Sequence, residues 1–243
     1  MRSERILLLV FAVVLCGSAV AQLTSDVIVS AAGENDKTIC SENGHPETNC
    51  SGSYSFVDSN QDIDFLGSAS TTAAYGPIKA TMYSSVYNYG FTTDYPATAM
   101  AEGYADSFDT IYIYGLADGE VAYLRGFFPA LTTPTGSGPW PFSYSINIQQ
   151  AANVYDCVVN STNPPNCSLK ILVTYSGGQP VPLELMRQLT SNAIASLAAG
   201  VPNGAYVFSG LQISAETNFK VVNAKGAIIP GVTVVGASGY IYN

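Results

Sequence analysis

Alternation between inward and outward side chains constrains the fold of this chain more than any other feature. From Lys79 to Tyr87, small or apolar residues occupy the even positions and polar or aromatic residues occupy the odd ones. Similar runs cover Thr98–Phe108, Thr110–Tyr114 and Phe142–Gln149. Because successive side chains of a strand point to opposite faces, this period of two predicts β-strands. Roughly ten such short strands, separated by turn residues, are typical of an antiparallel β-sandwich.

The predicted fold is therefore all-β, a two-sheet antiparallel sandwich of jelly-roll type. The sequence Asp118-Gly119 lies between two of the strand-like runs, which is typical of a β-hairpin. The segment Leu183–Ala199 fits both a helix and a strand, and we favour a strand because most other elements are strands. Later strands are expected at Tyr206–Ser214, Thr217–Val222 and Val232–Val235.

Two cysteine pairs with the same spacing predict two short disulfide-clamped loops. Cys40 and Cys50 enclose nine residues, as do Cys157 and Cys167. Each local bridge is expected to stabilise the fold by about 3 kcal/mol through loss of unfolded-chain entropy. The spacing matches neither a redox nor a zinc motif. The second bridge is expected to tie the base of a hairpin whose tip is Pro164-Pro165.

The N-terminal segment has the pattern of a secretory signal peptide, residues 1–21, ending at Ala19-Val20-Ala21. The remaining residues hold 7 Lys and Arg against 17 Asp and Glu, a formal charge of −10. Such a charge disfavours nucleic acid as a partner. No later apolar run reaches the roughly 20 residues of a membrane span. We therefore expect a secreted protein, extracellular or at the cell surface, without a transmembrane segment in the mature chain.

The domain organisation predicted from these patterns has three parts. The signal peptide, 1–21, precedes a polar N-terminal segment, 22–67, with a strand at Asp26–Ala31 and an irregular, disulfide-clamped excursion. The β-sandwich domain then covers 68–243. The strand-forming stretch Gln22–Ala32 is also a candidate for self-association, because it has the character of a strand that adds to the sheet edge of a neighbouring subunit.

The C-terminal sequence has a strand, turn and strand over Phe219–Val232, then Ser238-Gly239 and Tyr240, with a small-residue strand upstream at Ala101–Phe108. These motifs resemble those of the extracellular β-rich domains of exosortase-sorted (PEP-CTERM) bacterial proteins. The resemblance covers Ser68 to Tyr240 and implies a secreted β-sandwich without an assigned catalytic residue. The sorting motif expected after Tyr240 does not follow, so exosortase sorting is not implied.

Oxygen-bearing side chains at alternate positions predict a calcium-binding loop. The residues are Asp58, Asn60, Asp62 and Asp64. Carboxylate and amide oxygens are the ligands that Ca²⁺ prefers, although the glycine and glutamate of an EF-hand are missing here. A solvated polar turn is the simpler interpretation. Ca²⁺ is the one cofactor that the sequence suggests.

A sugar-binding platform and an acidic catalytic pair are two further candidates. Trp140, between two prolines, is a candidate ligand-binding residue, with strand tyrosines such as Tyr83 and Tyr87 beside it, although aromatic residues on strands are more commonly core. A glycosidase would need two carboxylates at a suitable separation. The candidates for such a pair are Glu102, Asp106, Asp109, Asp118 and Glu120.

The sequence thus predicts a secreted, non-enzymatic β-sandwich that acts by extracellular binding or by assembly into a matrix or surface layer. A partner glycan and self-association are the expected interactions. The alternatives are a carbohydrate-binding module and a secreted polysaccharide hydrolase that uses an acidic pair. The only histidine, His45, is expected to be a surface loop residue.

Overall fold

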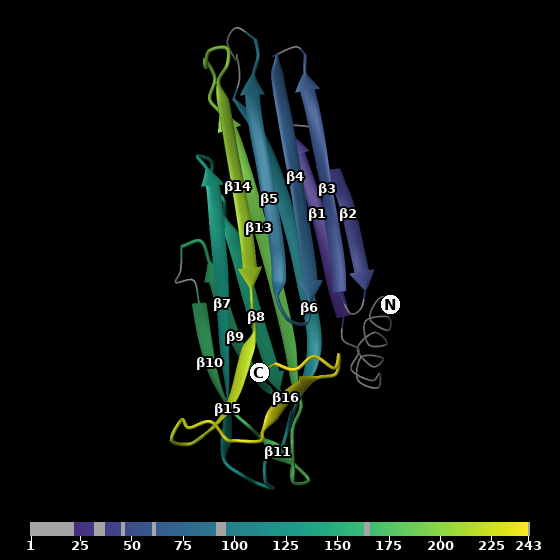
Figure 1. Cartoon of the computed structure of the whole chain (residues 1–243), viewed down its shortest axis with the longest axis vertical. Coiled ribbons are helices and arrows are strands. Elements are labelled where there is room, and N and C mark those ends of the chain that lie inside the picture. Colours follow the sequence, from purple (N-terminus) through teal and green to yellow (C-terminus); the bar gives the residue numbers. More distant parts are fainter. Residues whose placement is uncertain are drawn as a thin grey trace, which may run out of the picture.

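The structure is a computed structural model that describes residues 22–31, 37–44, 47–59, 62–90, 96–162 and 166–242. Within these ranges every regular element is a strand, and no helix is long and apolar enough to cross a membrane (Figure 1). The strands are β1 (Gln22–Ala31), β2 (Lys37–Gly44), β3 (Glu47–Asp58), β4 (Ile63–Ala74), β5 (Ile78–Asn88), β6 (Ala97–Tyr114), β7 (Ala122–Gly136), β8 (Phe142–Gln150), β9 (Asn153–Asn160), β10 (Asn166–Leu172), β11 (Tyr175–Ser176), β12 (Gln179–Pro180), β13 (Leu183–Leu197), β14 (Tyr206–Ala215), β15 (Asn218–Asn223) and β16 (Thr233–Gly236). The ambiguous segment is β13, which confirms the preferred strand.

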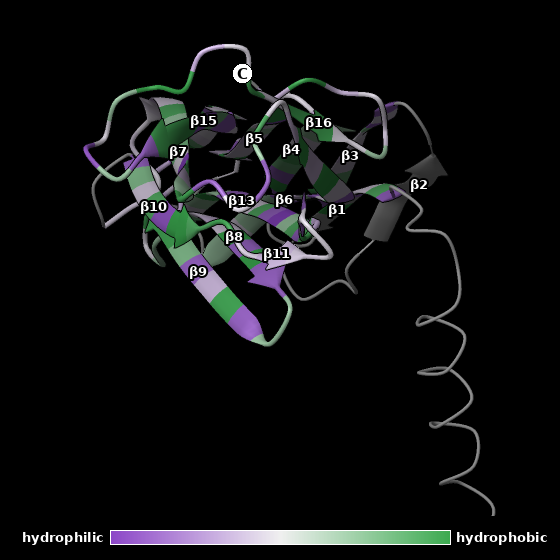
Figure 2. Cartoon of the chain, turned by 90° about the horizontal axis from the view of Figure 1, so that it is seen from below, coloured by the Kyte–Doolittle hydropathy of each residue, from purple (hydrophilic) through white to green (hydrophobic). Residues whose placement is uncertain are grey.

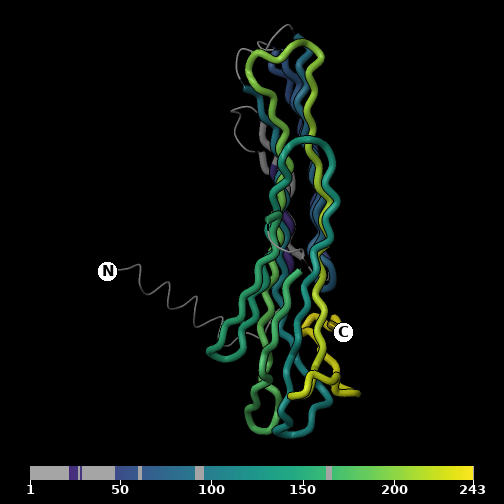
Figure 3. Tube along the Cα trace, turned by 90° about the vertical axis from the view of Figure 1, so that its left-hand side faces the viewer, coloured from purple at the N-terminus to yellow at the C-terminus, as the bar shows by residue number. Residues whose placement is uncertain are grey.

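Two large antiparallel sheets face each other along the whole length of the molecule (Figure 3). The first sheet has the order β2-β1-β6-β13-β8-β9, and β16 also pairs with β6. The second sheet has the order β10-β7-β14-β5-β4-β3, and β15 also pairs with β7. This arrangement confirms the predicted two-sheet sandwich.

The strands from β5 to β14, apart from the short β11–β12 pair, follow the pairing of a jelly-roll. In the second sheet β5 pairs with β14 and β7 pairs with β10, while in the first sheet β6 pairs with β13 and β8 with β9. The later strands of this set thus pair with the earlier ones in reverse order, from β8 with β9 out to β5 with β14. This is the double Greek key of a jelly-roll. The strands β1 to β4 widen it, since β1 lies beside β6 and β4 lies beside β5.

The prediction of an irregular excursion before residue 68 is wrong for the described residues. They form β2, β3 and β4, and β4 runs across the expected boundary at residue 67. Half of the outward positions of β3 and β4 are serine or threonine, so the segment looks loop-like in sequence, although the inward positions of β4 are buried. β1 pairs with β6 on one side and β2 on the other. Exchange of β1 between subunits stays a prediction and requires the loss of both ladders.

Alternating burial builds the core between the two sheets. In Figure 2 hydrophobic and hydrophilic bands alternate along strands such as β9. β13 shows the pattern most fully, because its inward positions are buried along its whole length. A smaller cluster at one end includes Ile63, Phe65 and Val86, and the main cluster fills the rest of the sandwich.

The disulfide between Cys157 and Cys167 joins the two sheets. Its Cα atoms are 6.3 Å apart. The prediction that it ties the base of a hairpin is wrong, because β9 is an edge strand of the first sheet and β10 an edge strand of the second. The predicted Pro164-Pro165 tip lies outside the described residues. At the opposite side, Cys50 is buried on the edge strand β3. Cys40 belongs to the edge strand β2, but its side chain is not among those described, so the bond between Cys40 and Cys50 stays a prediction.

Candidate cationic groove

Three basic residues form a row across three neighbouring strands of the second sheet. Arg125 on β7 lies directly opposite Lys170 on β10 and, on its other side, directly opposite Lys220 on β15. All three side chains are exposed on the outer face of the sheet. We call the depression that they line the cationic groove.

The row is not neutralised by acidic side chains in the described part of the chain. None of the three cations has a salt bridge there, although the Lys170 ammonium lies 4.1 Å from the centre of the Tyr123 ring. Like charges directly opposite one another destabilise a sheet. A concentration of positive charge that costs stability, in a chain with an excess of carboxylates, points to an anionic ligand.

Beside this row lies a second row with hydrogen-bonding and aromatic side chains. Phe127, two residues after Arg125 on β7, lies opposite Ser168 on β10 and opposite Asn218 on β15. The Phe127 side chain is 45% exposed on the same outer face of the sheet. The groove therefore combines fixed positive charge, an exposed ring, and hydroxyl and amide groups.

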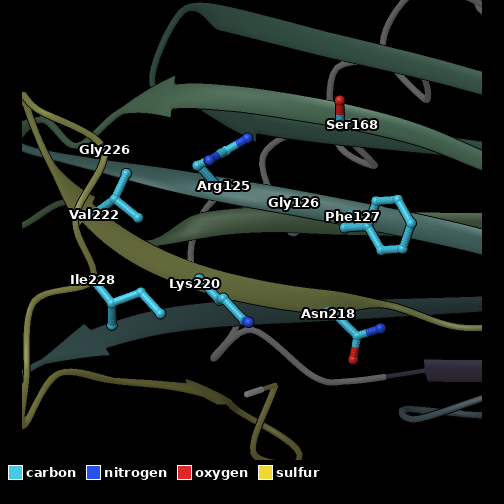
Figure 4. A pocket seen from close by; sticks show the side chains of 9 residues that line it. All are labelled: Arg125, Gly126, Phe127, Ser168, Asn218, Lys220, Val222, Gly226 and Ile228. Carbon is cyan, nitrogen blue, oxygen red and sulfur yellow. The ribbon is translucent and has the colours of Figure 1, made fainter.

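The groove consists of two hollows. The larger has a volume of about 730 Å³ and extends over β7 and β15 to the loop after β15 (Figure 4). The smaller, about 300 Å³, lies between Arg125 and Lys170. Arg125, Ser168 and Gly226 line both hollows, so the two meet at Arg125. The lining of the larger hollow is Arg125, Gly126, Phe127, Ser168, Asn218, Lys220, Val222, Gly226 and Ile228.

A tight turn after β15 forms one wall of the groove. The side-chain Oδ1 of Asn223 accepts hydrogen bonds from the backbone N–H groups of Lys225 and Ala227, at 3.0 and 3.1 Å. Gly226 has a φ of +85°, a conformation that glycine adopts at little cost. The turn holds Ile228, 60% exposed, beside the hollow.

These groups are suited to binding an anion. A guanidinium presents a planar fork that can donate two parallel hydrogen bonds to a carboxylate, while a lysine ammonium acts as a point charge. The lining residues of the two hollows include no carboxylate, histidine or cysteine. The three cations can bind a negatively charged group, and the exposed ring of Phe127 can pack against a flat apolar surface of the same ligand.

The predicted calcium ligands lie at one end of the sandwich, far along the chain from the groove. Asp58 ends β3 and Asp64 lies on β4, while Asn60 is outside the described residues. Burial raises the pKa of Tyr89, and the charges of Asp62, Asp64 and Asp58 add to this effect, so these carboxylates lie near its ring. Among the residues described, no group of three or more His, Cys, Asp or Glu side chains is arranged to hold a metal ion. Calcium binding stays a prediction.

The structure separates the acidic candidates for catalysis into three places. Glu102 and Asp106 are on the outer face of the first sheet, whereas Asp109 points inward and is 1% exposed. Asp118 and Glu120 are in the turn between β6 and β7. These five carboxylates therefore do not share one cleft.

The aromatic residues named from the sequence also separate. Trp140 is half-buried and packs against the main core. Tyr83 and Tyr87, on the outer face of β5, instead contact Phe208 and Tyr206 of β14. Binding of a sugar by Trp140 stays a prediction.

Comparison with known proteins gives no further guide to the ligand. No family model matches the chain, and no curated protein matches its sequence. The cationic groove was missed from the sequence because its three cations are 45 and 50 residues apart and their register is not encoded locally. The only sequence signal is that four of the seven basic residues after position 21 follow residue 120 outside β13.

Proposed function

We propose that this chain is an extracellular, non-enzymatic binding protein whose ligand is an acidic glycan held in the cationic groove. The observation that carries the proposal is the unneutralised row of Lys170, Arg125 and Lys220. Carboxylate or sulfate groups on the glycan would neutralise this row, and charge-assisted hydrogen bonds are the strongest that a protein surface offers.

The second row of the groove supports a glycan over a simple anion. Phe127 presents an exposed ring between Ser168 and Asn218. An aromatic ring can pack against the apolar face of a sugar, and hydroxyl and amide groups can bond sugar hydroxyls. An inorganic anion has no apolar surface that could pack against an exposed aromatic ring. The resemblance to extracellular domains of exosortase-sorted proteins favours the same setting.

The compartment is part of the proposal. A disulfide between Cys157 and Cys167 joins the two sheets, and such bonds persist in oxidising environments. The secretory pattern of residues 1–21 is consistent with that environment. Together they support export from the cell.

The test is calorimetric titration with an oligogalacturonate and with a neutral oligosaccharide of the same length. We expect binding of the acidic ligand only, and a loss of at least about tenfold in affinity for Arg125→Glu. Lys79→Glu is the matched control, because Lys79 is exposed on the outer face of the same sheet and the net charge changes equally. Equal binding of both sugars, or equal losses in both variants, would refute a site at Arg125.

A further inference from the structure

The two hollows of the cationic groove form one path across the strands. The smaller hollow is lined by Lys170, the larger by Lys220, and Arg125 belongs to both. Since β10, β7 and β15 are neighbours, the path runs perpendicular to the strand direction. An occupant of both hollows must be elongated in that direction.

From this path we propose that the ligand is a linear polyuronate, a chain of sugar residues that each carry a carboxylate, lying across the strands. The inference rests on the function proposed above and adds the class of polymer, its direction and the subsites that it fills. Neighbouring strands are about 4.8 Å apart, so the positive charges recur at about that interval over about 10 Å. A single sugar acid can engage only one part of such a row.

The three cations differ in a way that defines the subsites. Arg125, at the centre, presents a fork that holds one carboxylate in a fixed plane. Lys170 and Lys220, at either side, attract carboxylates without fixing their orientation. A chain centred on Arg125 therefore places its neighbouring acid groups toward the two lysines.

Phe127 supplies the contact that a bare polyanion would not need. Its position two residues from Arg125 on the same face of β7 places it about 7 Å farther along that strand. With the carboxylates directed to the cation row, the ring faces and hydroxyls of the same sugars lie over Phe127, Ser168 and Asn218. The two rows thus recognise two sides of one chain.

The test combines ligand length with single substitutions. Galacturonic acid and its dimer, trimer and hexamer are titrated into the full mature chain by calorimetry, with a sulfated oligosaccharide of matched length as a further ligand. We expect affinity to rise by about tenfold or more from monomer to trimer and then to level off. Arg125→Ala should weaken every length. Lys170→Ala and Lys220→Ala should weaken the trimer and hexamer but leave the monomer unchanged, and Lys79→Ala should change none.

Each other outcome overturns a defined part of the inference. Equal affinity for monomer and hexamer would overturn the claim that the ligand is a polymer, but it would leave the proposed binding of an acidic glycan intact. Losses at Lys170 that are the same for every length would overturn the direction across the strands. Equal or tighter binding of the sulfated chain would overturn the claim that the groove selects carboxylate groups. Absence of binding to any acidic glycan would refute both this inference and the proposed function.

Discussion

Tyr242 donates its hydroxyl hydrogen to Oδ2 of Asp109 at 2.8 Å, which ties the C-terminal end of the described chain to the middle of β6. Asp109 is buried and also accepts hydrogen bonds from the backbone N–H and the hydroxyl of Ser238. Burial raises the pKa of Tyr242 strongly, with Arg187 opposing the shift and Asp109 adding to it. Burial, with a further contribution from Asp109, likewise raises the pKa of Tyr75 to about 12.

These shifts predict a loss of stability in alkaline solution. Above about pH 10 the unfolded chain releases the protons of Tyr242 and Tyr75, whereas the folded chain retains them. The unfolded state then binds fewer protons, so the free energy of unfolding falls as the pH rises, and the contribution is fully present below pH ~10. Urea unfolding between pH 8 and 11.5 should show a shallower decline for Tyr242→Phe than for the wild type. Tyr114→Phe, at an exposed position, is the control, and identical slopes in all three proteins would contradict the prediction.

Arg187 is predicted to be the most costly single side chain to remove from the core. It is fully buried, and its guanidinium donates hydrogen bonds to the backbone oxygens of Ala74 and Gly76 and to the hydroxyls of Ser107 and Thr217. Arg187→Met removes these four hydrogen bonds together with the only buried cation among the described residues. We expect the free energy of unfolding to fall by about 3–5 kcal/mol in urea titrations.

Two further variants define the origin of that loss. Arg187→Lys keeps the charge but not the fork, so it should recover only part of the stability. Arg187→Met combined with Asp109→Leu should lose less than the sum of the two single changes, because the buried charge is gone. Additive losses would show that the two residues are energetically independent.

The bond between Cys157 and Cys167 is predicted to hold the sandwich closed at one side. Cys157→Ala with Cys167→Ala should lower the free energy of unfolding by about 2–4 kcal/mol. Since the two strands lie in opposite sheets, we also expect faster amide hydrogen exchange in β9 and β10 than in β6 and β13. A uniform change in exchange over all strands would mean that the bond acts only on the unfolded chain.

The long strands were predictable because their inward and outward positions differ in composition. β13, for instance, has buried leucine or alanine at most odd positions, a pattern that fits a strand, and the many strands elsewhere in the chain favoured a strand over a helix. Which strands pair with one another was not predictable from the sequence. The Asp118-Gly119 turn indicated a hairpin, but it joins β6 of the first sheet to β7 of the second, so that prediction is wrong. Turn residues determine where the chain reverses, while contacts far apart in sequence determine which sheet receives the next strand.

The candidate site was less predictable than the fold for a related reason. Net charge describes the whole chain, whereas the groove depends on Arg125, Lys170 and Lys220 occupying one register level. A shift of one residue in β10 would turn Lys170 toward the core, and nothing local to its sequence fixes that register. The acidic candidates show the converse, because Asp106 and Asp109 are close in sequence yet face opposite sides of the first sheet.

Gly226 is predicted to determine the shape of the groove without determining the stability of the fold. Its φ is +85° and a Cβ there would meet no atom within 4 Å, so the cost of Gly226→Val comes from backbone conformation alone, about 1–2 kcal/mol. Because the turn forms the groove wall, we expect this variant to weaken oligogalacturonate binding. Gly204→Val is the matched control, since Gly204 has a φ of +83° and equally open surroundings in the turn before β14. Gly226→Asn, which tolerates this conformation, should bind more tightly than Gly226→Val, and equal affinity in all variants would show that the turn does not contact the ligand.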